Sequence, residues 1–130
     1  MARRSYLVDS NTIIHASKAP KGEIARWLKV NKPFVTDVSL HECLERWKRL
    51  DEPGKVEEKI YLESFFIKVK KAGRFLETMR HPAVSERAYQ LNRNHNIKIK
   101  DALIAAAAEI YGHILVTADR KKDFAPRLEK

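Results

Sequence analysis

Short, unbroken apolar runs recur along the chain and predict a parallel sheet. Tyr6–Val8 and Ile114–Thr117 lack the polar alternation of a half-exposed strand. Runs of this kind are typical of strands that are buried on both faces of a parallel sheet. Two further strands are predicted at Phe34–Thr36 and Phe75–Thr78.

Apolar residues spaced three and four positions apart predict helices between these strands. The segment Ser39-Leu40-His41-Glu42 matches a capping box, so we expect one helix to begin at Ser39. Alternating strands and helices favour an α/β fold, in which right-handed crossovers place helices on both faces of the sheet. The predicted helices are Pro20–Val30, Ser39–Leu50, Val56–Lys71, one that begins near Pro82, and Lys100–Tyr111, with a helix or turn at Asn11–Ala16.

The length and charge of the chain narrow the class of protein. Its 130 residues suffice for one domain, and we expect residues 1–130 to form a single unit. Lys and Arg number 26 against 17 Asp and Glu, which gives a net charge of +9. An excess of this size favours polyanionic partners such as nucleic acid, although a merely soluble basic protein is the alternative.

Membrane insertion and cysteine chemistry are both disfavoured. No apolar run is long enough to span a membrane, and the N-terminal run is too short for a signal-peptide core, so we expect a cytoplasmic protein. Cys43 is the only cysteine, which excludes an intramolecular disulfide and argues against a cysteine-based zinc site. We expect Cys43 to be a small core residue.

Four acidic residues fall where an α/β fold would bring them to one place. Asp9 ends the first apolar run, Asp119 follows the last, and Glu42 and Asp101 lie near predicted helix starts. Strand carboxyl ends and helix amino ends share an edge of a parallel sheet, which is where ligands bind. Four carboxylates gathered there would repel one another unless a cation joined them. Because Mg²⁺ and Mn²⁺ prefer oxygen ligands, the sequence predicts a hard divalent metal site.

Each of these acids also has a structural explanation. Asp9 could form a turn after a strand, and Glu42 could be the reciprocal member of the capping box. Asp101 could interact favourably with a helix dipole, and Asp119 could be a loop residue. Capping and metal binding are compatible, because a carboxylate near a helix amino end is held in its charged form.

At these residues the chain resembles PIN-domain proteins, specifically the VapC toxin ribonucleases of prokaryotic toxin–antitoxin pairs. The resemblance covers nearly the whole chain, and its third motif is the most specific. The matching stretches are Leu7–Ile14, Val38–Leu44, Lys100–Ala108 and Leu115–Asp119, the last followed by Asp123 and Phe124.

The resemblance implies a PIN-like three-layer α/β/α fold with a central, mostly parallel sheet of four or five strands. It implies a Mg²⁺- or Mn²⁺-dependent endoribonuclease that is usually a homodimer neutralised by an antitoxin protein. Its catalytic and metal-binding quartet would be Asp9, Glu42, Asp101 and Asp119, supported by Ser10, Asn11 and Thr117. Asp123 is the alternative to Asp119, which lies closer to the strand end.

Several cations flank the expected acidic edge and could hold an RNA backbone, with a solvated basic face as the alternative. They are Lys98, Lys100, Arg120, Lys121 and Lys122. Trp27 and Trp47 fit the apolar stripes of their helices, so we expect them in the core, although Trp27 and Leu28 could instead line an apolar groove for an antitoxin helix.

Two other functions compete with the ribonuclease. A PIN fold could bind RNA or a protein without cutting. A phosphatase with Asp9 as nucleophile would resemble the haloacid-dehalogenase-like enzymes. It ranks last because Asn11 stands where they carry a second acid.

Overall fold

The computed structural model describes residues 4–51 and 54–117 and contains one parallel sheet with the strand order β3-β2-β1-β4. Leu7 in the central strand lies opposite Phe34 of β2 on one side and Leu115 of β4 on the other. The predicted parallel α/β architecture is confirmed. The strands are β1 (Tyr6–Val8), β2 (Phe34–Thr36), β3 (Phe75–Leu76) and β4 (Ile114–Val116).

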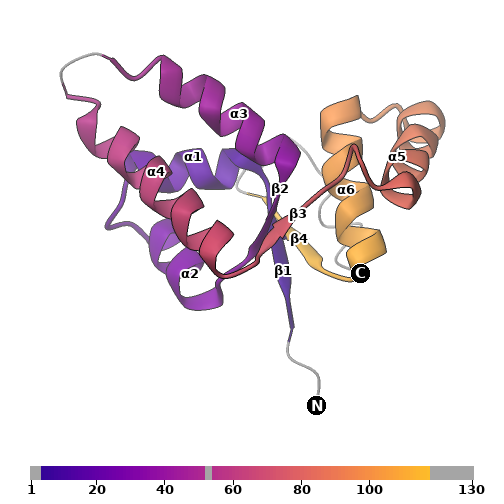
Figure 1. The fold of residues 1–130 in the computed structure, drawn as a ribbon, viewed down its shortest axis with the longest axis horizontal. Coiled ribbons are helices and arrows are strands. Elements are labelled where there is room, and N and C mark those ends of the chain that lie inside the picture. Colours follow the sequence, from indigo (N-terminus) through magenta and orange to yellow (C-terminus); the bar gives the residue numbers. More distant parts are fainter. Residues whose placement is uncertain (1–3, 52–53, 118–130) are drawn as a thin grey trace.

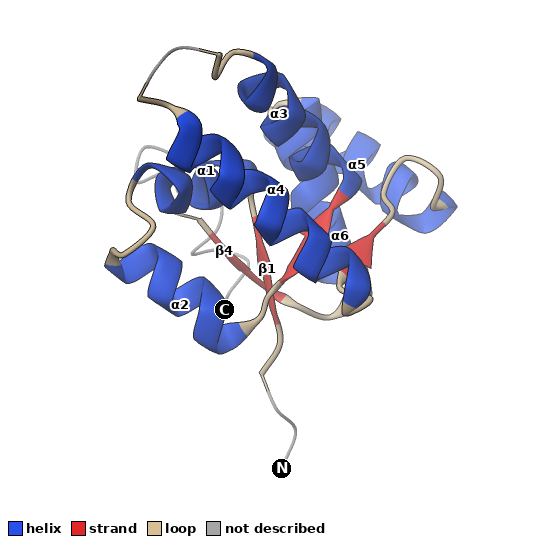
Figure 2. Ribbon diagram, turned by 60° about the vertical axis from the view of Figure 1, so that its left-hand side comes forward, coloured by secondary structure: helices blue, strands red, loops and turns tan. Residues whose placement is uncertain are grey.

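Helices cover both faces of the sheet, which gives three layers (Figures 1 and 2). Helices α1 to α4 lie on one side and α5 and α6 on the other. Within the described ranges, no helix is both long and apolar enough to cross a membrane. The helices are α1 (Ser10–Lys18), α2 (Glu23–Asn31), α3 (Asp37–Lys48), α4 (Val56–Lys71), α5 (Pro82–His95) and α6 (Ile99–Tyr111).

Alternation along β1 divides the core in two. Leu7 packs into the apolar cluster shared with α5 and α6, whereas Val8 packs into the cluster shared with α1 to α4. Successive strand residues point to opposite faces, so an apolar run without alternation is what a sheet covered on both sides requires. All seven residues of Ala102–Ala108 in α6 are buried, because five alanines allow this helix to approach the sheet closely.

Helix α3 begins earlier than the sequence pattern predicts. Its N-cap is Thr36, the last residue of β2, whose hydroxyl oxygen accepts a hydrogen bond of 3.2 Å from the Ser39 backbone N–H. The prediction of a capping box at Ser39–Glu42 is therefore wrong, since Ser39 lies inside the helix and is fully buried. Glu42 is consequently not engaged in capping its own helix.

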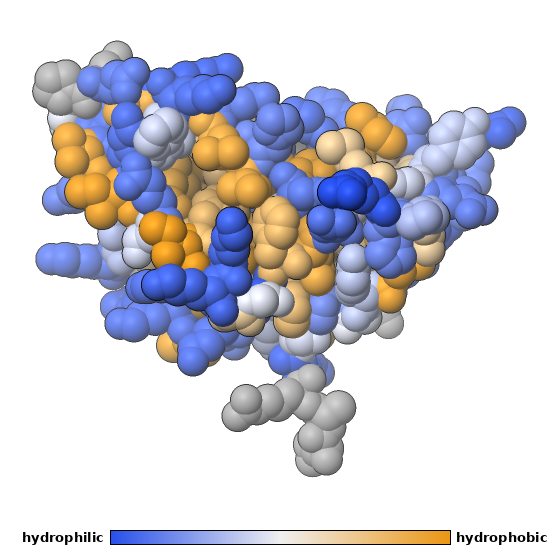
Figure 3. Space-filling view, viewed as in Figure 1, coloured by the Kyte–Doolittle hydropathy of each residue, from blue (hydrophilic) through white to orange (hydrophobic). Residues whose placement is uncertain are grey.

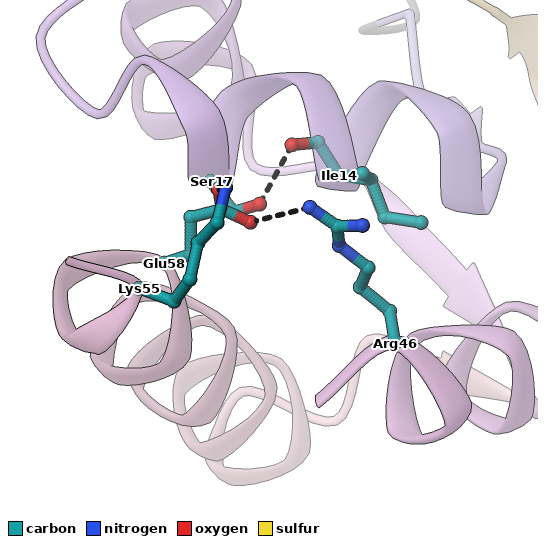
Figure 4. A network of polar contacts seen from close by, with 5 residues as sticks. All are labelled: Ile14, Ser17, Arg46, Lys55 and Glu58. Atoms are coloured by element: carbon teal, nitrogen blue, oxygen red, sulfur yellow. Dashed lines mark hydrogen bonds and ion pairs between the residues drawn. The ribbon is translucent and has the colours of Figure 1, made fainter. Parts of the chain in front are cut away.

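A partly buried ion pair connects α3 to α4 (Figure 4). Glu58, only 9% exposed, accepts a hydrogen bond of 2.9 Å from the Arg46 guanidinium, and Lys55 lies 3.5 Å from its other oxygen. Figure 4 shows the pair beside α1, where the Ser17 hydroxyl donates to the Ile14 carbonyl. Burial alone would raise the pKa of Glu58, but the hydrogen bond and charge of Arg46, helped by Lys55, lower it below its usual 4.5.

We expect Glu58→Gln to lower the free energy of unfolding by about 1–2 kcal/mol near neutral pH, because a charge-assisted hydrogen bond becomes a neutral one. A lowered carboxyl pKa in the folded state stabilises the protein above the unfolded-state pKa. That contribution is lost as the pH falls through the folded-state value. The difference between wild type and variant should therefore shrink below pH 4.5, as measured by urea unfolding at several pH values.

Asp51→Asn is the matched control for this prediction. Asp51 pairs with Lys59 at 3.0 Å, but its side chain is 78% exposed. Exposed pairs contribute little, so this variant should lose less than about 0.5 kcal/mol. Equal losses in the two variants would contradict a special contribution from the buried pair.

Candidate active site

Several predicted site residues directly follow strand ends or lie in the first turns of helices. Asp9 follows β1 directly, and Thr117 follows β4. Glu42 lies in the second turn of α3 and Asp101 in the first turn of α6. Helices α3 and α6 cover opposite faces of the sheet but both begin toward its upper end in the view of Figure 1. The connections of the fold thus place these residues after strand carboxyl ends or near helix amino ends, which adjoin in a parallel sheet.

Asp9 is held from two sides. It is 6% exposed and is the N-cap of α1. Its Oδ1 accepts hydrogen bonds from the Thr12 backbone N–H at 3.0 Å and from the Thr12 hydroxyl at 2.7 Å. Its Oδ2 accepts a short hydrogen bond from the Thr117 hydroxyl. A buried carboxylate needs such donors, and they fix its orientation.

Glu42 is brought next to Asp9 through Ser10. The buried Ser10 hydroxyl donates to Glu42 Oε1 at 2.8 Å. Burial raises the pKa of the neighbouring Cys43 thiol to about 12, and the charges of Glu42 and Asp9 both add to this shift. The carboxylates of Asp9 and Glu42 therefore both lie near enough to Cys43 to disfavour its thiolate. Cys43 is 1% exposed, which confirms its prediction as a core residue.

The charges of Asp9 and Glu42 are not balanced by nearby cationic side chains in the described part of the chain. The ion pairs found there involve other acids: Asp51, Glu58 and Glu109. The described contacts that orient Asp9 and Glu42 come from hydroxyl and backbone N–H groups, which carry no net charge. The two carboxylates would offer a metal only oxygen ligands, which suits Mg²⁺ or Mn²⁺, since Mg²⁺ is commonly bound by one or two carboxylates and several waters.

Other predicted site residues are less closely grouped. Asp101 is half-buried, with Lys98 and Lys100 exposed beside it, and Asn11 is half-buried in the first turn of α1. Across residues 4–51 and 54–117, no three His, Cys, Asp or Glu side chains form a group that could hold a metal ion. The structure therefore brings Asp9 and Glu42 together without assembling the full quartet. Asp119, Arg120, Lys121, Lys122 and Asp123 lie outside the described residues.

Two polar residues at this edge were not singled out from the sequence. Thr12 binds Asp9, and its position three residues after an N-cap aspartate is the signal that could have found it. Asp37 follows β2 and accepts hydrogen bonds from the backbone and hydroxyl of Thr78, at 3.0 and 2.6 Å. Asp37 therefore ties the ends of β2 and β3 together.

Solved structures share this fold at low sequence identity. PAE2754 from Pyrobaculum aerophilum is 19% identical, with a TM-score of 0.66 over 91% of this chain and 76% of that one. FitAcB from Neisseria gonorrhoeae is 20% identical, with a TM-score of 0.64 over 94% and 93%. A structure of FitAB bound to an IR36 DNA fragment is 21% identical, with a TM-score of 0.66 over 94% and 90%.

Sequence comparison assigns the chain to a family but finds no individual curated relative. A search of curated proteins found no match. The family model described as "PIN domain" matches residues 6–126, which include every candidate acid from Asp9 to Asp123. Since this match spans nearly the whole chain and the solved structures share its architecture, the chain belongs to the PIN domain family.

Proposed function

We propose that this protein is a Mg²⁺- or Mn²⁺-dependent endoribonuclease and the toxin of a VapBC-type toxin–antitoxin pair. PIN domains are generally nucleases, which supports a hydrolase that acts on nucleic acid. One observation carries the proposal further. Asp9 and Glu42 are oriented by uncharged donors, without an ion pair among the described residues, in a chain of net charge +9.

PIN nucleases typically use divalent metals, and the residues at this edge would fit one. A bound cation would supply a water of lowered pKa and neutralise charge that builds on a phosphoryl oxygen. Asp9 and Asp101 would be its principal ligands, and Glu42 would bind through water or orient the nucleophile. Asp119 would complete the set.

The remaining predicted site residues would position these acids and the substrate. Ser10 and Thr117 donate to Glu42 and Asp9, and Asn11 would support the same edge from α1. Exposed Lys98 and Lys100 would hold the RNA backbone. Arg120, Lys121 and Lys122 would extend this basic border. The resulting affinity would fall as salt rises, because cation–phosphate contacts release counterions.

A groove between α2 and α4 supports an antitoxin partner. Figure 3 shows apolar patches on the side of α1 to α4, with hydrophilic side chains projecting between them. The groove has a volume of about 360 Å³ and is lined by Ala25, Leu28, Tyr61 and Phe65 together with Lys29, Lys32, Lys68 and Arg74. An apolar floor with cations beside it fits an amphipathic helix that carries acidic residues. Trp27 does not line this groove and instead contacts Tyr6 edge to face.

We expect Asp9→Asn to reduce RNA cleavage more than about 100-fold, because even outer-shell partners of metal ligands cost 10–100-fold when they are lost. Asparagine caps helices as well as aspartate does, so the thermal midpoint should change little. Cleavage is measured on a mixed cellular RNA pool by mapping new 5′ ends, with circular dichroism on the same samples. A folded variant that cleaves like the wild type would refute the role of Asp9, and Asp51→Asn is the remote control.

Chelation separates the enzyme from a non-catalytic binding module. We expect EDTA to abolish cleavage and added Mg²⁺ or Mn²⁺ to restore it, because the oriented carboxylates alone cannot activate water. Gel-shift binding to the same RNA, assayed in parallel, should survive chelation. RNA binding without any cleavage in the presence of Mn²⁺ would favour the binding module.

We expect charge reversal in the groove to weaken the partner without affecting the nuclease. Lys29→Glu with Lys68→Glu should reduce binding of the protein encoded by the adjacent reading frame by about 10-fold or more, since interfacial charge reversal places like charges together. Lys71→Glu, on the same helix but outside the groove, is the control. Calorimetry measures binding. Unchanged affinity in the double variant would show that the partner binds outside the groove. RNA cleavage by the same variant shows separately whether the acidic site is intact.

A further inference from the structure

We propose that the Thr12 side chain is a positioning residue for Asp9. Its hydroxyl sets the orientation in which the Asp9 carboxylate presents its remaining acceptor site to a divalent cation. The inference rests on the proposed metal-dependent function but concerns a residue to which neither the sequence motifs nor the PIN match assigns a role.

The Thr12 hydroxyl does more than capping requires. An N-cap aspartate needs only a backbone N–H from the first turn, and the Thr12 N–H already supplies it at 3.0 Å. The hydroxyl adds a second hydrogen bond to the same Oδ1 at 2.7 Å. Valine at this position would keep the backbone N–H of the cap and the side-chain shape while removing the hydroxyl. The hydroxyl therefore needs an explanation beyond helix formation.

The two hydrogen bonds on Oδ1 restrict rotation of the carboxylate. Thr12 is 3% exposed and β-branched, so its side chain has few accessible rotamers. The Thr117 hydroxyl, just after β4, donates a hydrogen bond to Oδ2. A carboxylate offers about four acceptor sites, and among the described residues three are filled, two of them on Oδ1. The remaining acceptor site lies on Oδ2. Its direction is fixed because the two hydrogen bonds to Oδ1 hold the plane of the carboxylate.

Metal ligands depend on such partners for their orientation. Removal of an outer-shell hydrogen bond typically costs 10–100-fold in metal affinity or activity. A residue that serves only the helix cap would instead change thermal stability and leave metal affinity unaltered. Metal affinity and stability therefore distinguish the two roles of Thr12.

The test uses the 130-residue chain with Thr12→Val and Thr12→Ser, and Mn²⁺ alone as the probe. Calorimetry gives the dissociation constant for Mn²⁺, and circular dichroism gives the thermal midpoint. We expect Thr12→Val to weaken Mn²⁺ binding by about 10-fold or more and Thr12→Ser, which keeps the hydroxyl, to restore it to within about 3-fold. Thr12→Ala, which also removes the hydroxyl and favours the helix, repeats the comparison should the valine variant not fold.

The outcomes separate this inference from the proposed function. Wild-type Mn²⁺ affinity in folded Thr12→Val overturns the positioning role while the nuclease proposal stands. Equal weakening in Thr12→Val and Thr12→Ser also overturns it, because the hydroxyl would then not be the cause. No Mn²⁺ binding by the wild type, or binding that survives Asp9→Asn, overturns the metal site itself and this inference with it.

Discussion

The buried carboxylate of Asp9 is the constraint around which this structure is organised. A buried charge is costly unless donors surround it. Here a backbone N–H and a hydroxyl from α1 and a hydroxyl from the end of β4 supply them. The contact with Thr117 joins residues 108 positions apart, so it forms only when β1 and β4 are already paired. Sheet assembly and site assembly are thus the same event at this edge.

Charge is distributed unevenly between this edge and the rest of the molecule. The chain carries 26 Lys and Arg, yet no described cation pairs with Asp9 or Glu42. Instead, Arg46 and Lys55 neutralise Glu58, which has a structural role between α3 and α4. Not every acid with a structural role has a cationic partner among the described residues, because Asp37 is bound by the backbone N–H and hydroxyl of Thr78. Asp9 and Glu42 likewise have neutral partners, which leaves their charge available to a ligand.

The sequence predicts strands better than helix starts, for a physical reason. Apolar runs such as Tyr6–Val8 are dictated by burial on both faces, and burial is visible in residue type. A helix start depends on which hydroxyl reaches the first turn, and both Thr36 and Ser39 carry suitable groups. The pairing of Ser10 with Glu42 joins residues 32 apart and leaves no local pattern. The acids were identifiable from predicted strand ends and helix starts, but the partners that orient Asp9 and Glu42 required the fold.

The row of small side chains in α6 has a consequence for mutational tolerance. Ala105, Ala106 and Ala107 are completely buried against the sheet and the neighbouring helices. Any larger side chain there must push the helix outward, since packed interiors leave no room for added methylenes. Asp101 sits one turn before this row and would move with the helix. A larger residue at one of these alanines would therefore shift Asp101, although the alanines themselves lie away from the candidate site.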